Sequence, residues 1–316
     1  MATVLITGGT GMIGSSLSAL LLQKGYEVII LTRNTAEQKK PAVTGLSFAS
    51  WNVDAQSIDT GALKKADYIV HLAGAGVADK RWTAKRKKEI VDSRTKSSAL
   101  LVKALRENSN TVKAVISASA IGWYGADPVI PNPNPFSETA ASDDGFLGDT
   151  CRQWEESIEA VRQLDKRLVK LRTGIVLSKT GGALNEFIKP LRFGIATILG
   201  GGKQIISWIH LDDLCRIYLQ AIEDESMEGV YNAVAPRPVS NKKLTIDLAT
   251  AIKNKFYIPI YVPSLVLKIV LGEMSIEVLK SATVSANKIR TAKFNFIYPS
   301  IEAALNQLIA KKKADQ

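Results

Sequence analysis

The chain opens with Thr3-Val4-Leu5-Ile6-Thr7-Gly8-Gly9-Thr10-Gly11-Met12-Ile13-Gly14, an apolar run that leads directly into a glycine-rich turn. Apolar residues spaced along 17–22 predict a helix after this turn. Residues 28–31, Val-Ile-Ile-Leu, follow Gly25 and predict a second strand. The chain therefore starts with a strand–helix–strand unit.

The spacing of three glycines in this unit predicts a ligand. Gly8 permits a tight turn at the strand end, Gly11 lets the backbone approach a pyrophosphate, and Gly14 allows the helix to pack closely on the strand. The N–H groups of the first helical turn then face the anion. The sequence predicts a dinucleotide site of the Rossmann type, with a simple strand-to-helix turn that binds nothing as the alternative.

Strands and helices continue to alternate along the first half of the chain. Further strands are predicted at 46–51, 68–72, 112–117 and 168–172, with helices ending near 105 and spanning 148–164. Strands that alternate with helices imply a parallel sheet covered on both faces. The predicted fold class is α/β, a Rossmann-type doubly wound parallel sheet with a smaller C-terminal substrate or lid region.

The alternation stops after residue 172, which predicts a domain boundary. We expect residues 1–178 to form the NAD(P)-binding Rossmann domain, with 203–235 returning to it. Residues 179–202 and 236–316 should form the smaller C-terminal region, which includes helices around 184–193 and 244–252 and an irregular end.

Composition narrows the class of protein. The chain is 46% hydrophobic and 22% charged, as globular proteins are. We expect a cytoplasmic protein without a membrane span, because the start lacks a secretion signal and the late apolar stretch 263–271 is too short. The two cysteines, Cys151 and Cys215, signal neither a disulfide framework nor a zinc site.

The formal net charge of +11 is compatible with nucleic acid, an anionic surface or a phosphate-rich ligand. The sequence carries no aromatic and basic platform and no recognition motif, so we expect no nucleic-acid partner. The basic run 80–88 leads into a helix and fits either a solvated helix start or a rim that attracts phosphate.

Arg33 bears on the identity of the dinucleotide. NAD sites generally place an acidic residue at the end of the second strand, where it binds the ribose 2′-hydroxyl. This chain has Thr32-Arg33 there. Because a guanidinium is permanently charged and can bond a phosphate through two N–H groups, the sequence predicts NADP(H) rather than NAD(H). A surface arginine without a ligand is the alternative.

Further motifs follow in order along the chain. They are His71-Leu72-Ala73-Gly74, the run 117–125 from Ser117-Ala118-Ser119 to Tyr124-Gly125, Cys151 with Trp154-Glu155, the run 208–214, and a closing segment at about 260–308. With the glycine turn, these resemble the extended short-chain dehydrogenases/reductases. Within that superfamily the chain resembles the branch of epimerase family proteins, which are nucleoside-diphosphate-sugar epimerase-like and have a characteristic C-terminal domain.

The resemblance implies cofactor contacts and a substrate cleft for a small molecule that it does not identify. Many members of the superfamily dimerise through helices of the core, so a homodimer is compatible with it. The implied cofactor-binding residues are Gly8, Thr10, Gly11, Met12, Ile13, Gly14, Thr32, Arg33, Leu72, Ala73 and Gly74, together with Glu89 and Arg94.

The catalytic positions depart from the superfamily pattern, which is a Tyr-x-x-x-Lys pair with a preceding serine. Ser119 is present, but the tyrosine position holds Cys151 and the lysine position holds Glu155. A negative charge at Glu155 should raise the pKa of Cys151, so the thiol is expected to be a poor base. The candidate catalytic residues are Ser119, Tyr124, Cys151 and Glu155, and Cys151 as a small buried apolar residue is the alternative.

Three further polar residues have structural alternatives. We expect structural roles for His210 and Asp213, since the resemblance implies that Asp213 stabilises a turn; His210 lining the substrate cleft is the alternative. Arg172 is expected either to bind a substrate anion or to pair with an acid of this chain. The predicted function is that of an NADP(H)-binding oxidoreductase or epimerase-like protein. The alternative is a catalytically impaired NADP(H)-binding protein with a regulatory or sensor role.

Overall fold

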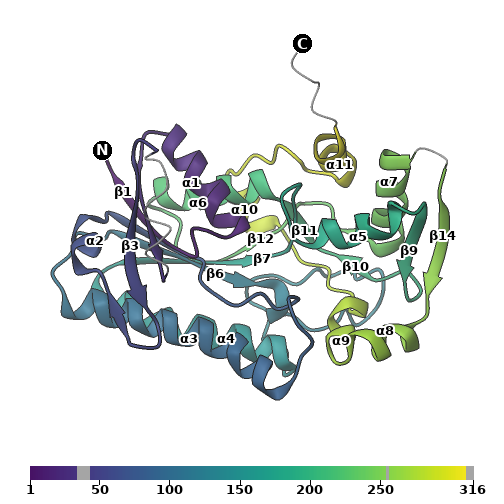
Figure 1. The fold of residues 1–316 in the computed structure, drawn as a ribbon, viewed down its shortest axis with the longest axis horizontal. Helices are drawn as coiled ribbons and strands as arrows, with labels where there is room; N and C mark the ends of the chain where they lie inside the picture. Colours follow the sequence, from purple (N-terminus) through teal and green to yellow (C-terminus); the bar gives the residue numbers. More distant parts are fainter. Residues whose placement is uncertain (34–42, 254–255, 311–316) are drawn as a thin grey trace, which may run out of the picture. The chain divides into compact units, whose positions relative to one another are not determined.

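The computed structural model describes residues 1–33, 43–253 and 256–310 (Figure 1). The chain divides into two compact units. The first comprises residues 1–123, 141–172 and 215–231, and the second comprises 124–140, 173–214 and 232–316. The proline-rich loop 124–140 thus belongs with the second unit, whereas the boundaries expected from the sequence kept it in the first.

An eight-stranded sheet has the order β12-β7-β6-β5-β1-β2-β3-β4. Strand β1 lies parallel between β2 and β5, with β3 parallel to β2 and β6 parallel to β5, while the short β4 is antiparallel to β3. The predicted α/β fold with a mostly parallel sheet is confirmed. The strands are β1 Thr3–Thr7, β2 Glu27–Thr32, β3 Leu46–Asn52, β4 Ser57–Ile58, β5 Tyr68–His71, β6 Ala114–Ala120, β7 Arg167–Thr173 and β12 Gly229–Ala233.

Helices pack on this sheet through apolar faces. All five residues of β1 are buried, and Leu5 and Ile69 share a core with Leu101 of α3 and Ile158 of α4. The side chain of Thr83 caps the long α3 by accepting a hydrogen bond from the N–H of Arg86. The helices are α1 Met12–Gln23, α2 Thr60–Lys65, α3 Ala84–Glu107, α4 Phe146–Glu159 and α6 Leu211–Glu223, with short 3₁₀ helices η2 at Ile121–Trp123 and η3 at Ala160–Leu164.

The second unit contains three strand pairs and several helices. Its core gathers apolar residues of α5, α7 and α11, among them Leu184, Leu248 and Leu305. The elements are β8 Ile175–Leu177, α5 Ala183–Leu191, β9 Ile195–Leu199, β10 Ile205–Ile206, β11 Trp208–His210, β13 Val239–Ser240, α7 Asn241–Lys253, β14 Ile258–Val262, α8 Ser264–Leu271, α9 Met274–Leu279, α10 Asn287–Thr291 and α11 Ile301–Ile309.

Asp213 fastens one of the turns of the second unit. Its carboxylate accepts hydrogen bonds from the backbone N–H groups of Ile297 and Tyr298, both at 2.9 Å. His210 lies beside the Tyr298 ring, with 3.9 Å between the ring centroids, and it bonds Gln307 at 3.1 Å. These contacts give both residues the structural roles expected from the sequence.

Two differences from the predicted elements have physical reasons. The predicted helix 148–164 is α4 followed by η3, which ends at Asp165 in the left-handed region. Helix α8 was predicted as part of an irregular end, because six of its eight residues are Leu, Val or Ile and its two polar residues, Ser264 and Lys268, are too few to mark a helical period. In the part of the chain that the structure describes, no helix is long and apolar enough to cross a membrane.

Candidate functional site

The glycine turn after β1 lies directly against the end of β5. Gly8 has a φ of +67°, and a Cβ atom there would lie 2.9 Å from the carbonyl carbon of Leu72. A Cβ at Gly14 would overlap the carbonyl oxygen of Gly8 and the Cα of Gly9. Only glycine fits these two positions, so the loop folds tightly over the start of α1 as the spacing predicts.

Thr7 and His71 hold the ends of the two strands together. The Thr7 hydroxyl accepts hydrogen bonds from the N–H groups of Leu72 and Ala73, both at 3.1 Å, and lies 2.7 Å from Nδ1 of His71. Since both N–H groups donate to it, the hydroxyl donates its own proton to Nδ1. The ring proton then sits on Nε2, which lies 3.2 Å from the Ser98 hydroxyl on α3.

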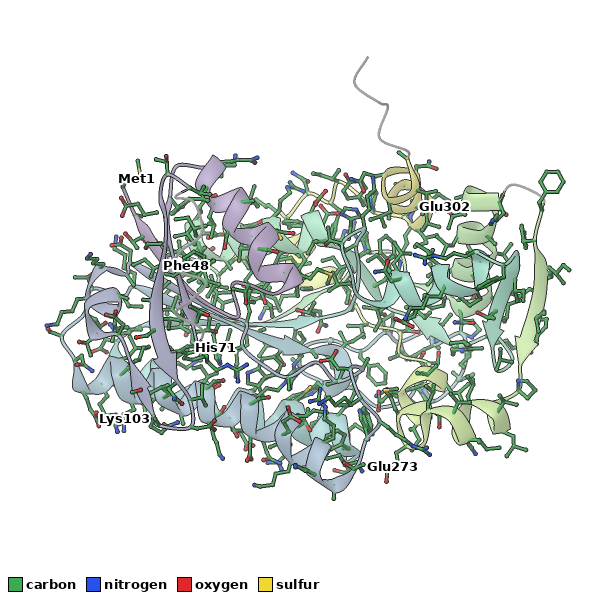
Figure 2. The ribbon with its side chains drawn as sticks, viewed as in Figure 1. Met1, Phe48, His71, Lys103, Glu273 and Glu302 are labelled. Atoms are coloured by element: carbon green, nitrogen blue, oxygen red, sulfur yellow. The ribbon has the colours of Figure 1, made fainter. Side chains whose placement is uncertain are left out.

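The surroundings of His71 keep its ring neutral. Figure 2 shows the side chain in the interior of its unit, and the residue is fully buried. Burial, with a smaller contribution from the nearby Arg94 charge, lowers the pKa of His71 to about 3. The neutral ring with its two bonded nitrogens makes the ends of β1 and β5 one rigid support for the glycine turn.

The start of α1 is suited to an anion. Gly11 is the N-cap residue and has no side chain to cap the helix, and the first turn carries no acidic residue. The free N–H groups at such a terminus and the positive end of the helix dipole attract phosphate. Met12, Ile13 and Gly14 supply this first turn, and Thr10 lies in the loop before it.

Arg33 follows the carboxyl end of β2 and is exposed, while Thr32 before it is buried. Since β1 and β2 run parallel with Thr7 opposite Leu31, Arg33 lies at the same sheet edge as the glycine turn. This is the place expected for a group that meets the 2′-position of the adenosine ribose.

Arg94 and Glu89 are both on α3, but their surroundings differ. Arg94 donates from Nη1 to the carbonyl oxygens of Ala75 and Ile90, at 3.0 and 2.9 Å, and a Cβ at Gly74 would lie 3.1 Å from its Cζ. Arg94 thus supports the loop after β5. The exposed Glu89 carboxylate pairs with Arg86 at 2.8 Å, a hydrogen bond that lowers the pKa of Glu89.

Glu155 is the centre of a buried group of charged side chains. Its Oε1 accepts from the Ser119 hydroxyl at 2.7 Å and from Nε of Arg172 at 2.8 Å, and its Oε2 accepts from Nη2 of Arg172 at 3.1 Å. Lys170 lies 3.7 Å from Oε2 and pairs with Glu159 at 2.6 Å. Of the two roles open to Arg172, the structure shows the pairing with an acid of this chain.

Trp123 completes the surroundings of Arg172. The guanidinium carbon lies 3.6 Å from the centroid of the Trp123 ring, a cation–π contact. Sequence reasoning did not single out Trp123 or Lys170. The signal available was spacing: Lys170 and Arg172 are two apart on a strand and share a face, whereas Glu155 and Glu159 are four apart on a helix and share a face. Two cations thus meet two anions.

Cys151 is a buried, neutral thiol. It is 4% exposed, and burial raises its pKa to about 12, with the Glu155 charge adding to the rise and the Arg94 charge opposing it. The direction agrees with the sequence-based expectation, but the main cause is burial rather than Glu155. The thiol is therefore a poor base at neutral pH.

Tyr124 lies in the core of the second unit. It has no exposed surface, its ring stacks on Phe136 with 5.4 Å between centroids, and its hydroxyl donates to Oδ1 of Asn232 at 2.6 Å. Its proton is thus engaged by an internal acceptor. Among the described residues, no group of three or more His, Cys, Asp or Glu could hold a metal ion, and neither cysteine takes part in a disulfide.

Comparison with known proteins decides the family. The model of the NAD dependent epimerase/dehydratase family matches residues 4–233, and a domain of unknown function (DUF1731) matches residues 262–308. The chain belongs to the NAD dependent epimerase/dehydratase family. The resemblance stated from the sequence, including the characteristic C-terminal domain, is confirmed.

Relatives in this family match over the whole chain. Epimerase family protein SSP1921 of Staphylococcus saprophyticus is 34% identical over 309 residues, which cover 98% of this chain and 100% of that protein. The crystal structure of human epimerase family protein SDR39U1 with NADPH has a TM-score of 0.83 at 28% identity and covers 97% of this chain and 99% of that chain.

A second solved structure, the nucleoside-diphosphate sugar epimerase from Corynebacterium glutamicum, has a TM-score of 0.76 at 32% identity. It matches 99% of this chain but only 59% of its own length. Both structures agree with the Rossmann-type fold described above.

Proposed function

We propose that this family member is an NADP(H)-dependent oxidoreductase or epimerase-like enzyme acting on a small molecule. The observation that carries the proposal is the anion site at the start of α1, built on the Thr7–His71 support, with Arg33 at the same sheet edge. The similarity to a human protein crystallised with NADPH supports the choice of cofactor.

The residues at this site fit the nucleotide. The uncapped first turn of α1 would hold the pyrophosphate, Arg33 would bond the 2′-phosphate, and the loop at Leu72, Ala73 and Gly74 would lie against the cofactor. The bound cofactor supplies hydride transfer at nicotinamide C4, and the protein supplies orientation.

We propose that Ser119 and Glu155 take up the proton that the substrate hydroxyl loses. The Ser119 hydroxyl already donates to Glu155, so its oxygen is free to accept the proton of a substrate hydroxyl while passing its own proton to the carboxylate. Arg172 holds that carboxylate in place through two hydrogen bonds. This pair would replace the tyrosine and lysine of the superfamily, while Cys151 stays neutral.

A regulatory or sensor protein that binds NADP(H) without turnover is the second candidate function. One observation favours it: Glu155 is engaged by Arg172, and the Cys151 thiol is buried and neutral where the superfamily places its tyrosine. Turnover that is lost in Ser119→Ala with NADPH binding unchanged supports the enzyme. Tight binding with no hydride exchange across a carbonyl and sugar-nucleotide panel supports the sensor.

The first experiment is titration with NADPH and NADH, followed by the quenching of protein fluorescence, on wild type, Arg33→Ala and Arg106→Ala. We expect Arg33→Ala to weaken NADPH binding by about 10–100-fold, the size of a lost hydrogen bond to a charged group, and to leave NADH binding unchanged. Arg106 is exposed at the far end of α3 and serves as the matched control.

Equal loss for both nucleotides would assign Arg33 no role at the 2′-phosphate, and absence of binding by either would refute both candidate functions. We also propose that the protein is cytoplasmic, which is supported by its two buried cysteines forming no disulfide.

A further inference from the structure

Helix α8 is largely apolar yet exposed, with Ser264 and Lys268, four residues apart, on its polar side. Six of its eight residues are Leu, Val or Ile, and Leu267 alone among them is classed as buried. Leu265, Val266, Ile269 and Val270 keep between 45% and 69% of their surface exposed. Exposed apolar patches of this kind mark interaction sites, so α8 needs a cover that the described residues of the chain do not provide.

The strand before α8 adds to this apolar surface. Figure 1 shows β14 beside β9, to which it is paired in parallel, with α8 following β14 along the chain. Tyr261 lies opposite Ile198, and Ile198 is buried in the core of the second unit, so these two share the covered face. Ile258 and Ile260 point to the other face and are 67% and 44% exposed.

The open edge of β14 is a poor template for another strand. The N–H of Ile258 donates to Gly194, and the carbonyl of Val262 accepts from Gly200. In a parallel strand, the backbone groups of alternate residues bond the same neighbouring strand. The backbone groups of Pro259 and Tyr261 therefore point toward the open edge of β14. Proline has no N–H to donate, so a partner must pack on side chains rather than extend the pair of strands.

We propose that this C-terminal apolar surface binds the same surface of a second copy of the chain. It consists of eight side chains of residues 256–276: Phe256, Ile258, Ile260, Leu265, Val266, Ile269, Val270 and Ile276, each between 44% and 83% exposed. With roughly 100 Å² left exposed on each partly exposed side chain, they offer on the order of 800 Å². A standard protein interface buries about 800 Å² per partner, so the area suffices.

Charge favours a second copy over an anionic membrane. The chain carries a formal net charge of +11, but residues 256–276 contain one cation, Lys268, and one anion, Glu273. A neutral apolar surface lacks the cluster of basic residues that an anionic lipid surface attracts. In a two-fold pair each contact is made twice, which allows Lys268 and Glu273 of opposite copies to attract each other.

The core helices are the competing interface. The exposed side of α3 is strongly charged, with Lys85, Lys88, Lys96, Lys103 and Arg106 all exposed. Stable homodimer interfaces are depleted of lysine and enriched in apolar side chains. The C-terminal apolar surface has that composition and the outer side of α3 does not.

Sedimentation-velocity measurements across a wide range of protein concentration test the proposal, with light scattering to give the mass. We expect wild type to dimerise, and Ile258→Lys and Ile269→Lys each to raise the dimer dissociation constant by about 10–100-fold. Ile297→Lys is the matched control, since Ile297 is 53% exposed in the same unit but outside this surface. Ala99→Glu, at an exposed position of α3, tests the competing interface.

NADPH titration of every variant shows that the first unit is still folded. A wild type that stays monomeric at all concentrations overturns the proposal, and so does a dimer that survives both lysine variants or is lost only in Ala99→Glu. Sedimentation of the monomer with phosphatidylserine vesicles, lost in Ile269→Lys, would overturn it in favour of a lipid partner.

Discussion

The hydroxyl of Ser119 donates a hydrogen bond to Oε1 of Glu155 at 2.7 Å, and both side chains are buried. This contact joins the carboxyl-terminal end of β6 to α4, at the residue that the sequence predicts to correspond to the superfamily's lysine. Arg172 and Lys170 surround the same carboxylate. If that prediction holds, the local charge pattern of the superfamily is inverted, because cations of β7 hold an anion at this position.

Glu155→Gln should destabilise the protein strongly. The substitution keeps the shape of the side chain but leaves the buried Arg172 without its counter-charge, which costs about 3–5 kcal/mol when a buried ion pair loses one partner. Urea unfolding measures the change. Glu156→Gln is the control, because the Glu156 side chain is 61% exposed and pairs with Arg152 on the surface. The free energy of unfolding should fall there by less than about 1 kcal/mol. Equal losses of unfolding free energy in the two variants would contradict a structural role for the buried Glu155 ion pair.

Gly8→Ala should abolish dinucleotide binding and lower stability more than Gly25→Ala. Both glycines have positive φ, at +67° and +83°, so both substitutions cost about 1 kcal/mol of backbone strain. A Cβ at Gly25 meets nothing within 4 Å, whereas at Gly8 it meets the backbone of Leu72 at 2.9 Å. Thermal unfolding and NADPH titration together separate the two. Similar unfolding temperatures for both variants would contradict the close approach to Leu72.

Stability should fall as the pH drops below about 6.5, in part through His71. Its folded-state pKa of about 3 lies below the ordinary value of 6.5, so the unfolded chain binds the proton first. The stabilising contribution of His71 is fully present above pH 6.5 and is lost as the pH falls toward 3. At pH 5 the loss amounts to about 2 kcal/mol.

His71→Gln tests this by urea unfolding at pH 7 and pH 5. The difference between the two pH values should shrink by about 2 kcal/mol relative to wild type. His210, whose pKa is also lowered by burial, accounts for a remaining dependence of the same sign. An unchanged stability difference between pH 7 and pH 5 in the variant would show that the pKa of His71 is not lowered in the folded protein.

Cys151 should resist alkylation in the native protein. With its pKa raised to about 12, the thiol stays protonated at pH 8.5, and the ionised form that reacts is absent. Labelling with iodoacetamide, located by mass spectrometry, should therefore proceed only as fast as the protein unfolds. Ala99→Cys provides an exposed thiol on α3 as the comparison. Rapid native labelling of Cys151 would indicate an accessible thiolate.

Alkaline titration gives the same thiol a second signature. Since the folded pKa of Cys151 is above that of an unfolded cysteine, its stabilising contribution is full below about pH 9 and is lost as the pH rises toward 12. Cys151→Ala should flatten the fall in stability over this range.

The sequence was most informative where structure depends on neighbours along the chain. The unit from β1 to β2 and the roles of Gly8 and Gly14 follow from local spacing, and the structure has them as predicted. The partners of buried polar groups could not be predicted this way. Tyr124 bonds Asn232, 108 residues away, so its engagement depends on tertiary folding that no local pattern encodes.

The same limit applies to the candidate catalytic group. Glu155 and Arg172 were each singled out from the sequence, but their pairing depends on how α4 packs beside β7. The spacing of Lys170 with Arg172 and of Glu155 with Glu159 is visible in the sequence. It explains the pairing only once the packing of α4 beside β7 is known. For α8 the difficulty was different, since a largely apolar run gives no period that separates a helix from a buried strand.

Thr7 has one more consequence. Because its hydroxyl is already bonded to Leu72, Ala73 and His71, the support for the glycine turn exists before any nucleotide arrives. Such preorganisation means that little of the interaction energy is lost to ordering the chain on association. The nucleotide is expected to bind rapidly and in a single kinetic phase, because the glycine turn does not rearrange on binding.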